Sequence, residues 1–279
     1  NFGVAESSQY EQYAKNMKSY IEAIDKTRPI TVGDNNPNGL QNANTQEFRN
    51  KVSTVLAKNG EGLAGANYSM GSMAGIHKTH PDWKIIATES ASPSNSRGIY
   101  NTLSQYNKTG DYQCTAYDTN AVSWGNTARE SWWYTIKDDF VSGEFIWTGF
   151  DYIGEPTPWN GTGTGSVSGD QLAVPNSSYF GVIDTAGFEK DSFYFYTSQW
   201  REDKKTLHIV PQSWNAEDLS ISGGKVPVYV YSNAAKVELY LNDKLIGTST
   251  RTPIKTAAGH EWATYSNVSN DADQCTAVN

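Results

Sequence analysis

Carboxylates beside aromatic side chains are the residues of this 279-residue chain that are best suited to chemistry. In the run 143–159, GEFIWTGFDYIGEPTPW, Asp151 and Glu155 lie between Trp147 and Trp159. An aromatic ring packs against the apolar face of a sugar, while carboxylates accept hydrogen bonds from its hydroxyl groups or react at its anomeric carbon. The run therefore predicts a carbohydrate site. The alternative is a core strand whose aromatic residues only fill volume.

A second carboxylate, Glu89, comes at the end of a short apolar segment. The residues 81–92, PDWKIIATESAS, are typical of a strand with Glu89 at its carboxyl end. Catalytic residues of (β/α)-barrels lie at the carboxyl ends of the strands. Glu89 is therefore the leading catalytic candidate, and the alternative is an ordinary strand-end glutamate.

Helices and strands are expected to alternate along the first two thirds of the chain. Helices are predicted at 10–24, 45–56, 70–77, 128–140 and before Trp200, the first of them capped by Ser8. Strands are predicted at 29–33, 63–68, 84–89 and 144–150, the last with a bend near Gly149. The Ser/Asn/Gly-rich region 92–126 is expected to hold at most one helix. This alternation indicates βα units and a parallel sheet. Only four units are present, whereas a closed barrel needs eight.

Four strands would leave two sheet edges and a large apolar face exposed, so the chain is expected to be a fragment whose other half precedes Asn1. From about Leu207 the pattern changes to alternating strands, with Asn242-Asp243 as a hairpin turn. The predicted fold class is therefore α/β plus all-β. The predicted domains are 1–204 and 205–279, the second too short for a complete sandwich of about 100 residues.

Composition excludes several functional classes. A net charge of −8 without a Lys/Arg cluster argues against nucleic acid as a partner. No apolar run approaches the roughly 20 residues that span a bilayer, so no membrane insertion is expected, and no signal peptide is recognisable. Cys114 and Cys275 match no metal-site spacing and are interpreted as free thiols. His77 and His80 are interpreted as surface residues.

Several motifs, in order, resemble glycoside hydrolase family 2, and most closely its bacterial β-galactosidases. They are DKTRPITVG at 25–33, GLAGANYS at 62–69, IIATES at 85–90, FIWTGFD at 145–151, SSYFGVIDTAG at 177–187, SQW at 198–200, and VPVYVYSNA and VELYLNDK at 226–234 and 237–244. The resemblance covers nearly the whole chain. It implies the C-terminal half of a (β/α)8 TIM barrel followed by an immunoglobulin-like β-sandwich.

The resemblance also implies a retaining mechanism, with two carboxylates about 5–5.5 Å apart. Glu89 would be the nucleophile, and Tyr68 would orient it. Trp147 would form the platform under the sugar. The residues Asp151, Glu155 and Trp159 would bind hydroxyl groups or a second sugar. Asn67 is left out of the catalytic set because it points the opposite way from Tyr68 on a regular strand.

The general acid/base is the missing component. The family supplies it as the Glu of an Asn-Glu pair, and no such pair occurs in this sequence. Glu6 lies at a suitable distance before 28–29 but follows Ala, so a Glu upstream of Asn1 is the preferred candidate. The isolated chain is therefore expected to be inactive or nearly so.

The expected substrate is a terminal β-galactoside, because the Asn-x-Lys clamp of relatives that act on glucuronides has no convincing counterpart here. A β-mannosidase, a β-glucuronidase and a non-catalytic carbohydrate-binding or adhesion module remain as alternatives. The simplest expectation is hydrolysis without a cofactor and without a metal ligand in this chain, although some relatives use Mg²⁺ or Na⁺. Composition favours an extracellular or cell-surface bacterial location, with the cytoplasm as the alternative.

Overall fold

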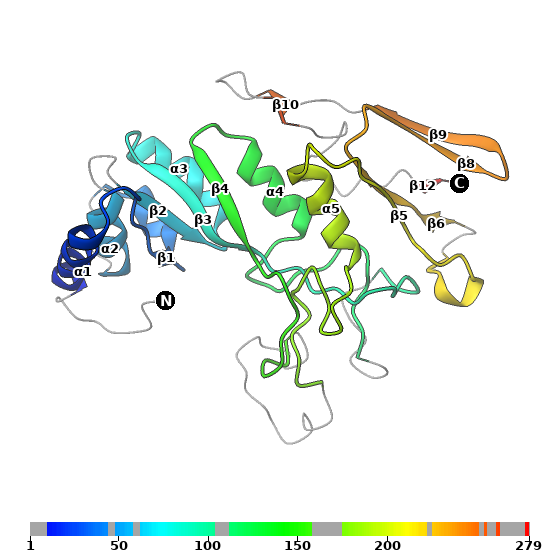
Figure 1. Cartoon of the computed structure of the whole chain (residues 1–279), viewed down its shortest axis with the longest axis horizontal. Coiled ribbons are helices and arrows are strands. Elements are labelled where there is room, and N and C mark those ends of the chain that lie inside the picture. The colour runs from blue at the N-terminus through cyan, green and yellow to red at the C-terminus, as the bar shows by residue number, and fades with distance from the viewer. Residues whose placement is uncertain are drawn as a thin grey trace. The chain divides into compact units, whose positions relative to one another are not determined.

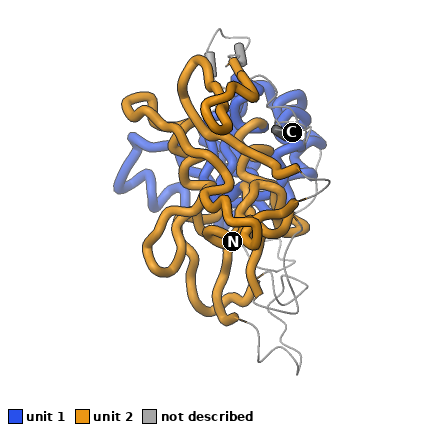
Figure 2. Tube along the Cα trace, turned by 90° about the vertical axis from the view of Figure 1, so that its right-hand side faces the viewer, with its two compact units in different colours: residues 1–90, 134–146, 256–258 blue, residues 91–133, 147–255, 259–279 orange. Residues whose placement is uncertain are grey.

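The chain forms two compact units in the computed structural model, which describes residues 10–43, 48–57, 62–103, 112–157, 175–221, 225–250, 254–255, 261–262 and 277–278. Unit 1 consists of residues 1–90, 134–146 and 256–258, and unit 2 of residues 91–133, 147–255 and 259–279 (Figure 2). This division differs from the expected boundary at 204/205, which stays a prediction.

Unit 1 is organised around a four-stranded sheet in the order β1-β2-β3-β4 (Figure 1). The strands are β1 (Gly33–Asp34), β2 (Leu63–Asn67), β3 (Lys84–Ala91) and β4 (Val141–Trp147). β1 pairs with β2, and β2 with β3, in parallel. The four strands in chain order confirm the predicted parallel α/β arrangement.

The predicted bounds of the fourth strand, 144–150, are wrong at both ends. β4 begins at Val141 and ends at Trp147. Beyond it the backbone pairs with the segment 180–183, because Thr148 N–H donates to the Phe180 carbonyl and Ile183 N–H to the Gly149 carbonyl, at 3.3 and 3.1 Å. Hydrogen bonds to a distant segment, which local sequence cannot reveal, therefore replace the expected continuation of the strand.

The predicted helices form with small shifts. They are α1 (Tyr10–Ile24), α2 (Phe48–Ala57), α3 (Met73–Thr79) after the 3₁₀ turn η3 (Met70–Ser72), α4 (Ala128–Ile136) and α5 (Asp191–Trp200), with a further 3₁₀ turn η1 (Pro37–Gln41). Met73 and Ile76 of α3 share a buried core with Ile85 and Ala87 of β3. None of the described helices is both long and apolar enough to cross a bilayer.

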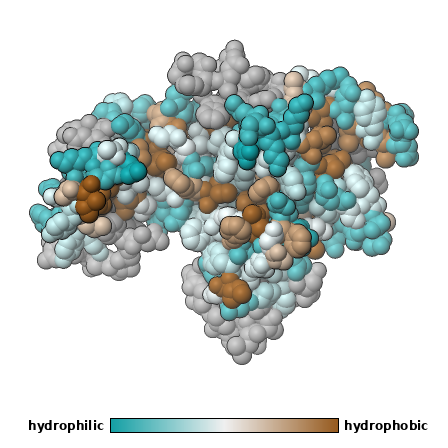
Figure 3. Space-filling model, in the orientation of Figure 1, coloured by the Kyte–Doolittle hydropathy of each residue, from teal (hydrophilic) through white to brown (hydrophobic). Residues whose placement is uncertain are grey.

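The apolar stripe of α1 is largely exposed. Its large members are between 40% and 90% exposed, and they are Tyr13, Met17, Tyr20, Ile21 and Ile24. Figure 3 shows hydrophobic residues at the surface in the part of the molecule that contains α1. A helix with such a stripe normally covers a core. These five side chains lie outside the buried cluster that Ala14 of α1 forms with Val52 and Leu56 of α2.

Unit 2 holds antiparallel strand pairs. β5 (Leu207–Val210) pairs with β7 (Tyr229–Ser232), and β8 (Lys236–Leu241) with β9 (Lys244–Thr250). The remaining pairs are β6 (Val226–Pro227) with β12 (Ala277–Val278), and β10 (Ile254–Lys255) with β11 (Glu261–Trp262), and a 3₁₀ turn η5 covers Ala216–Asp218. These strands confirm the all-β texture, whereas the immunoglobulin-like sandwich stays a prediction.

The turn between β8 and β9 forms at the predicted residues. Asn242 and Asp243 have φ values of 49° and 63°. Two successive residues at positive φ are what a type I′ hairpin turn requires, and Asn and Asp tolerate this conformation better than other residues with side chains. The hairpin prediction is therefore confirmed.

The region 92–126 contains no helix in its described parts, 92–103 and 112–126. Buried polar side chains satisfy its backbone instead. The Asn95 amide donates to the carbonyls of Thr115 and Tyr117, each at 3.0 Å. The Tyr117 ring lies edge-on to those of Tyr100 and Tyr229 in the core of unit 2.

Cys114 is a free, fully buried thiol, and burial raises its pKa to about 12. In a Cys275→Ser variant, which leaves only this thiol, we expect almost no reaction with a thiol reagent at pH 8, because roughly one thiol in ten thousand would be ionised. Reaction with Ellman's reagent should become fast in urea. Rapid stoichiometric labelling of the native variant would contradict the burial.

Candidate active site

Glu89 reaches the candidate site because the pairing of β2 and β3 shifts by one residue. Ala66 lies opposite Ala87, but Asn67 lies opposite Glu89, so Thr88 is an extra residue on β3. Side chains alternate between the faces of a strand, so a regular β3 would turn Glu89 to the same face as Ala87, which packs in the core. The shift places Glu89 with Asn67 on the other face. There the glutamate is half-buried.

Asn67 stabilises this irregular stretch. Its buried amide donates to Asn35 Oδ1 at 2.7 Å, and its Oδ1 accepts from the Thr88 hydroxyl at 2.5 Å. The extra residue is therefore fixed by a side-chain hydrogen bond. The register places Asn67 on the same face as Glu89, so the expected reason for omitting Asn67, its opposite direction, does not apply, and its omission from the catalytic set stays a prediction.

Tyr68 contacts Glu89 through the backbone, where its N–H donates to the Glu89 carbonyl at 3.0 Å. Its φ of 52°, and those of 60° and 67° at Ala91 and Ser92, are unusual for residues other than glycine. Such conformations persist where surrounding structure imposes them, often at functional sites. Among the described residues, none donates a hydrogen bond to the Glu89 carboxylate, so the orienting role of the Tyr68 hydroxyl stays a prediction.

Ser90 ties the end of β3 to β4. Its fully buried hydroxyl donates to Glu144 Oε2 at 2.9 Å and also lies 3.3 Å from the Phe145 carbonyl. The position of Glu89 is therefore constrained from both neighbours, by Thr88 toward β2 and by Ser90 toward β4.

Trp147, Tyr152 and Glu155 are linked by hydrogen bonds in unit 2. The indole Nε1–H of Trp147 donates to the Tyr152 hydroxyl oxygen at 3.3 Å, and that hydroxyl donates to Glu155 Oε2. Thr157 Oγ1 donates to the other Glu155 oxygen at 3.1 Å. Burial, together with the Glu155 hydrogen bond, raises the pKa of Tyr152, which keeps the phenol protonated at neutral pH.

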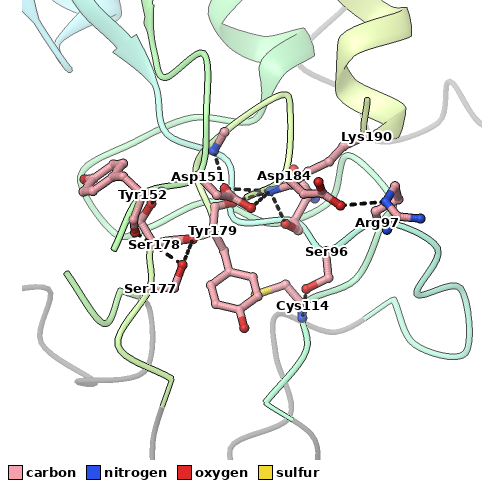
Figure 4. A network of polar contacts seen from close by, with 12 residues as sticks. Ser96, Arg97, Cys114, Asp151, Tyr152, Ser177, Ser178, Tyr179, Asp184 and Lys190 are labelled. Atoms are coloured by element: carbon pink, nitrogen blue, oxygen red, sulfur yellow. Dashed lines mark hydrogen bonds and ion pairs between the residues drawn. The ribbon is translucent and has the colours of Figure 1, made fainter. Parts of the chain in front are cut away.

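Asp151 contacts a buried lysine, Lys190 (Figure 4). Lys190 Nζ lies 2.8 and 2.7 Å from the two Asp151 oxygens and donates to the Asn95 carbonyl at 2.7 Å. The side chains are 1% and 8% exposed. Gly181 N–H also donates to Asp151 at 2.7 Å. These contacts leave Asp151 little surface for a sugar.

Burial raises the pKa of Asp151 and lowers that of Lys190, because removal from water penalises both charged forms, while the ion pair acts in the opposite direction on each. A nearby second pair, Arg97 with Asp184 at 2.7 Å, is more exposed. Burial would raise the pKa of Asp184, but the Arg97 hydrogen bond and two backbone N–H groups lower it.

The other residues singled out in the sequence are Glu6, Trp159 and two histidines. Glu6 and Trp159 lie outside the described residues. The interpretation of His77 and His80 as surface residues is corrected, because both are half-buried and stack on Phe140 and Trp83, with ring centroids 4.1 and 3.7 Å apart. No group of three or more metal-ligating side chains occurs among the described residues.

Sequence reasoning missed Lys190 and Tyr152. Lys190 is about 40 positions from its partner and sits in an unremarkable polar context, so no local signal marks it. Tyr152 lies in the aromatic run itself. Its separation from Glu155 by three residues in a loop was the only local indication that the phenol and the carboxylate could form a hydrogen bond.

Comparisons with known proteins agree on one family. A model described as a domain of unknown function, DUF4982, matches residues 223–267. Beta-galactosidase BoGH2A of Bacteroides ovatus is 36% identical over 245 residues, which cover 84% of this chain and 25% of that protein. The chain belongs to glycoside hydrolase family 2.

A further sequence relative of this family 2 chain has a different activity in its name, and a solved structure has the same fold. A beta-glucuronidase of Formosa agariphila is 29% identical over 180 residues, covering 63% of the chain and 16% of the relative. A solved beta-glycosidase from Bacteroides vulgatus has the same fold, with a TM-score of 0.62 and 24% sequence identity. The match covers 95% of this chain and 32% of the solved chain. The family 2 chain thus spans a quarter or less of these curated relatives.

The Thr88 hydroxyl should contribute to the register that presents Glu89. We expect Thr88→Val to lower the free energy of unfolding by about 1–3 kcal/mol, because it leaves the buried Asn67 Oδ1 without this donor. Thr88→Ser keeps the hydroxyl and is the matched control. Equal stability of the two variants in urea unfolding would show that the hydrogen bond does not matter.

Removal of one partner of the Lys190–Asp151 pair should strongly destabilise the loop that follows β4. Lys190→Met is expected to cost about 3–5 kcal/mol, because it leaves a buried carboxylate unpaired. The double variant Lys190→Met with Asp151→Leu should recover part of this loss, as thermal unfolding would measure. Arg201→Met, which breaks the exposed pair with Asp203, is the control and should change little.

Proposed function

We propose that this chain supplies the nucleophile of a retaining exo-β-glycosidase, with terminal β-galactosides as the preferred substrates. The observation that carries the proposal is Glu89, held at the carboxyl end of β3 by a register shift that turns it away from the core. Such positions carry catalytic residues in barrel enzymes. The β-galactosidase relative supports the choice of sugar.

In the proposed reaction the Glu89 carboxylate attacks the anomeric carbon as the glycosidic C–O bond breaks, and a general acid protonates the departing oxygen. In the second step the deprotonated general acid acts as a base and takes a proton from water. The water oxygen attacks the same anomeric carbon, the bond from that carbon to Glu89 breaks, and the sugar is released. The Tyr68 hydroxyl would steady the carboxylate, and Trp147 would pack against the sugar. The acid/base would be Glu6 or, preferably, a Glu upstream of Asn1.

The proposed architecture is the C-terminal half of a TIM barrel, 1–204, followed by an immunoglobulin-like domain, 205–279. The exposed stripe of α1 supports an incomplete barrel, because a stable barrel covers such a face. The N-terminal half of the enzyme is therefore the proposed partner of this chain. Without that half, we expect hydrolysis to be absent or very slow.

The charges near Trp147 support a neutral sugar. Glu155 is linked to Trp147 through Tyr152, and the cations Lys190 and Arg97 are already paired with Asp151 and Asp184. A glucuronide bound against Trp147 would bring a further carboxylate toward Glu155. A β-glucuronidase is the second candidate, because a curated relative carries that name.

The test is covalent trapping of the nucleophile. The chain, with and without the N-terminal polypeptide, is incubated with an activated 2-deoxy-2-fluoro-galactoside and, in parallel, with the corresponding glucuronide. Intact mass and peptide mapping should find one galactosyl adduct on Glu89 when both halves are present. Glu89→Gln should abolish labelling and lower hydrolysis at least about a thousandfold. Glu189→Gln, which changes an exposed glutamate, is the matched control.

The outcomes separate the alternatives. Labelling only by the glucuronide would replace galactose with glucuronate and keep the mechanism. An adduct on another residue would overturn the assignment of Glu89. No adduct from either sugar, with folded protein that still binds glycans, would favour a carbohydrate-binding module.

A further inference from the structure

We propose that Tyr152 and Glu155 are positioning residues that fix the indole ring of Trp147 before a sugar binds. This inference rests on the proposed function, in which Trp147 is the platform for the sugar. It changes the expected role of Glu155, which the sequence suggested as a direct ligand of substrate hydroxyl groups.

The direction of the hydrogen-bond chain follows from the groups themselves. An indole nitrogen can only donate, and an ionised carboxylate can only accept. Tyr152 lies between them, so its oxygen accepts from Trp147 Nε1–H, and its own O–H must donate to Glu155. The arrangement therefore has one consistent polarity, from indole to phenol to carboxylate.

Glu155 is itself held in place. Its second oxygen accepts a hydrogen bond from Thr157 Oγ1 at 3.1 Å, and Thr157 is fully buried. Both oxygens of the carboxylate therefore have donors from its own loop. Glu155 orients the phenol of Tyr152, which suits a positioning residue better than a free ligand for sugar hydroxyls.

The backbone of Tyr152 is anchored as well. Its N–H donates to the Ser178 hydroxyl at 3.1 Å, and its carbonyl accepts from Ser178 N–H at 2.8 Å. The preceding Asp151 is held by Lys190 and by the N–H of Gly181. A side chain at position 181 would meet the Asp151 nitrogen at 2.1 Å, so glycine is required for this close approach. The backbone at Tyr152 and the side chain of the preceding Asp151 are therefore both held in place, which limits the movement of the Tyr152 phenol.

The hydrogen bond between Trp147 and Tyr152 uses the edge of the indole ring and not its faces. The N–H bond lies in the plane of the indole, so the Tyr152 oxygen meets the edge of the ring, and the two rings are nearly perpendicular, at 87° with centroids 6.0 Å apart. Trp147 is half-buried, so part of its side chain remains accessible. A ring held by its edge keeps a face for the apolar side of a sugar, and binding then costs less side-chain entropy.

Tyr152→Phe removes the acceptor for the indole and keeps the aromatic ring. In the protein with its N-terminal half, we expect kcat/KM to fall about tenfold, mainly through KM, because a mobile platform weakens the binding of sugar. Glu155→Ala should lower kcat/KM by a similar factor. Glu155→Gln should keep most of the kcat/KM of the unaltered protein, because its amide oxygen still accepts a hydrogen bond from Tyr152. Tyr240→Phe breaks an exposed Tyr–Glu hydrogen bond and is the matched control.

Two measurements distinguish positioning from a general structural effect. In a Trp147→Phe background, Tyr152→Phe should have almost no further effect on kcat/KM, because its action passes through the indole. With 5-fluorotryptophan incorporated, the ¹⁹F resonance that disappears in Trp147→Phe should shift or broaden in Tyr152→Phe without any sugar present.

The outcomes are separable from those of the proposed function. An unchanged resonance and an unchanged kcat/KM in Tyr152→Phe would overturn the positioning role while leaving the enzyme intact. Additive losses in the double variant would also overturn it. If the unaltered protein hydrolyses no glycoside, the proposed function fails, whereas the ¹⁹F experiment still reports whether Tyr152 fixes Trp147.

Discussion

The alternation of side chains along β3 is the constraint on which the candidate nucleophile depends. Ile85 and Ala87 must face the helices of unit 1, and a regular strand would bury Glu89 on that same face. The extra residue Thr88 resolves this conflict by changing the register at the point where the strand ends. The protein thus keeps a continuous core and still presents a carboxylate on the other face. The cost is an irregular backbone, with positive φ values at Tyr68, Ala91 and Ser92.

A buried ion pair plays the corresponding role in unit 2. Trp147 is the last residue of β4, and the loop after it, which carries Tyr152 and Glu155, has no regular secondary structure to stiffen it. Lys190, just before α5, reaches Asp151 and the carbonyl of Asn95. It thereby joins three segments that are far apart in the sequence. Desolvation makes such a pair a poor source of net stability, but its geometry specifies one arrangement of the loop.

The two clusters have different chemical characters. Around Glu89 the neighbouring polar groups bind one another or the backbone, which leaves the carboxylate available for reaction. Around Trp147 the polar groups bind the indole and each other, which suits a fixed surface for recognition. The proposed function assigns the reacting carboxylate to the first cluster and the aromatic ring that holds the sugar to the second.

The sequence by itself determined the elements and the leading candidate. Local periodicity marks the helix 10–24, the strand that ends just before Tyr68 and the strand that bears Glu89. The Asn242-Asp243 turn follows from the conformations that these residues tolerate. Ordered motifs identified the family, because their residue types and spacing are local properties. The end of β4, the register shift at Thr88, and the partners of Asp151 and Tyr152 were decided only by the tertiary structure. Each depends on contacts between segments distant in the chain, such as 148–149 with 180–183 and Asp151 with Lys190, and a local pattern does not encode which distant group fills a hydrogen bond.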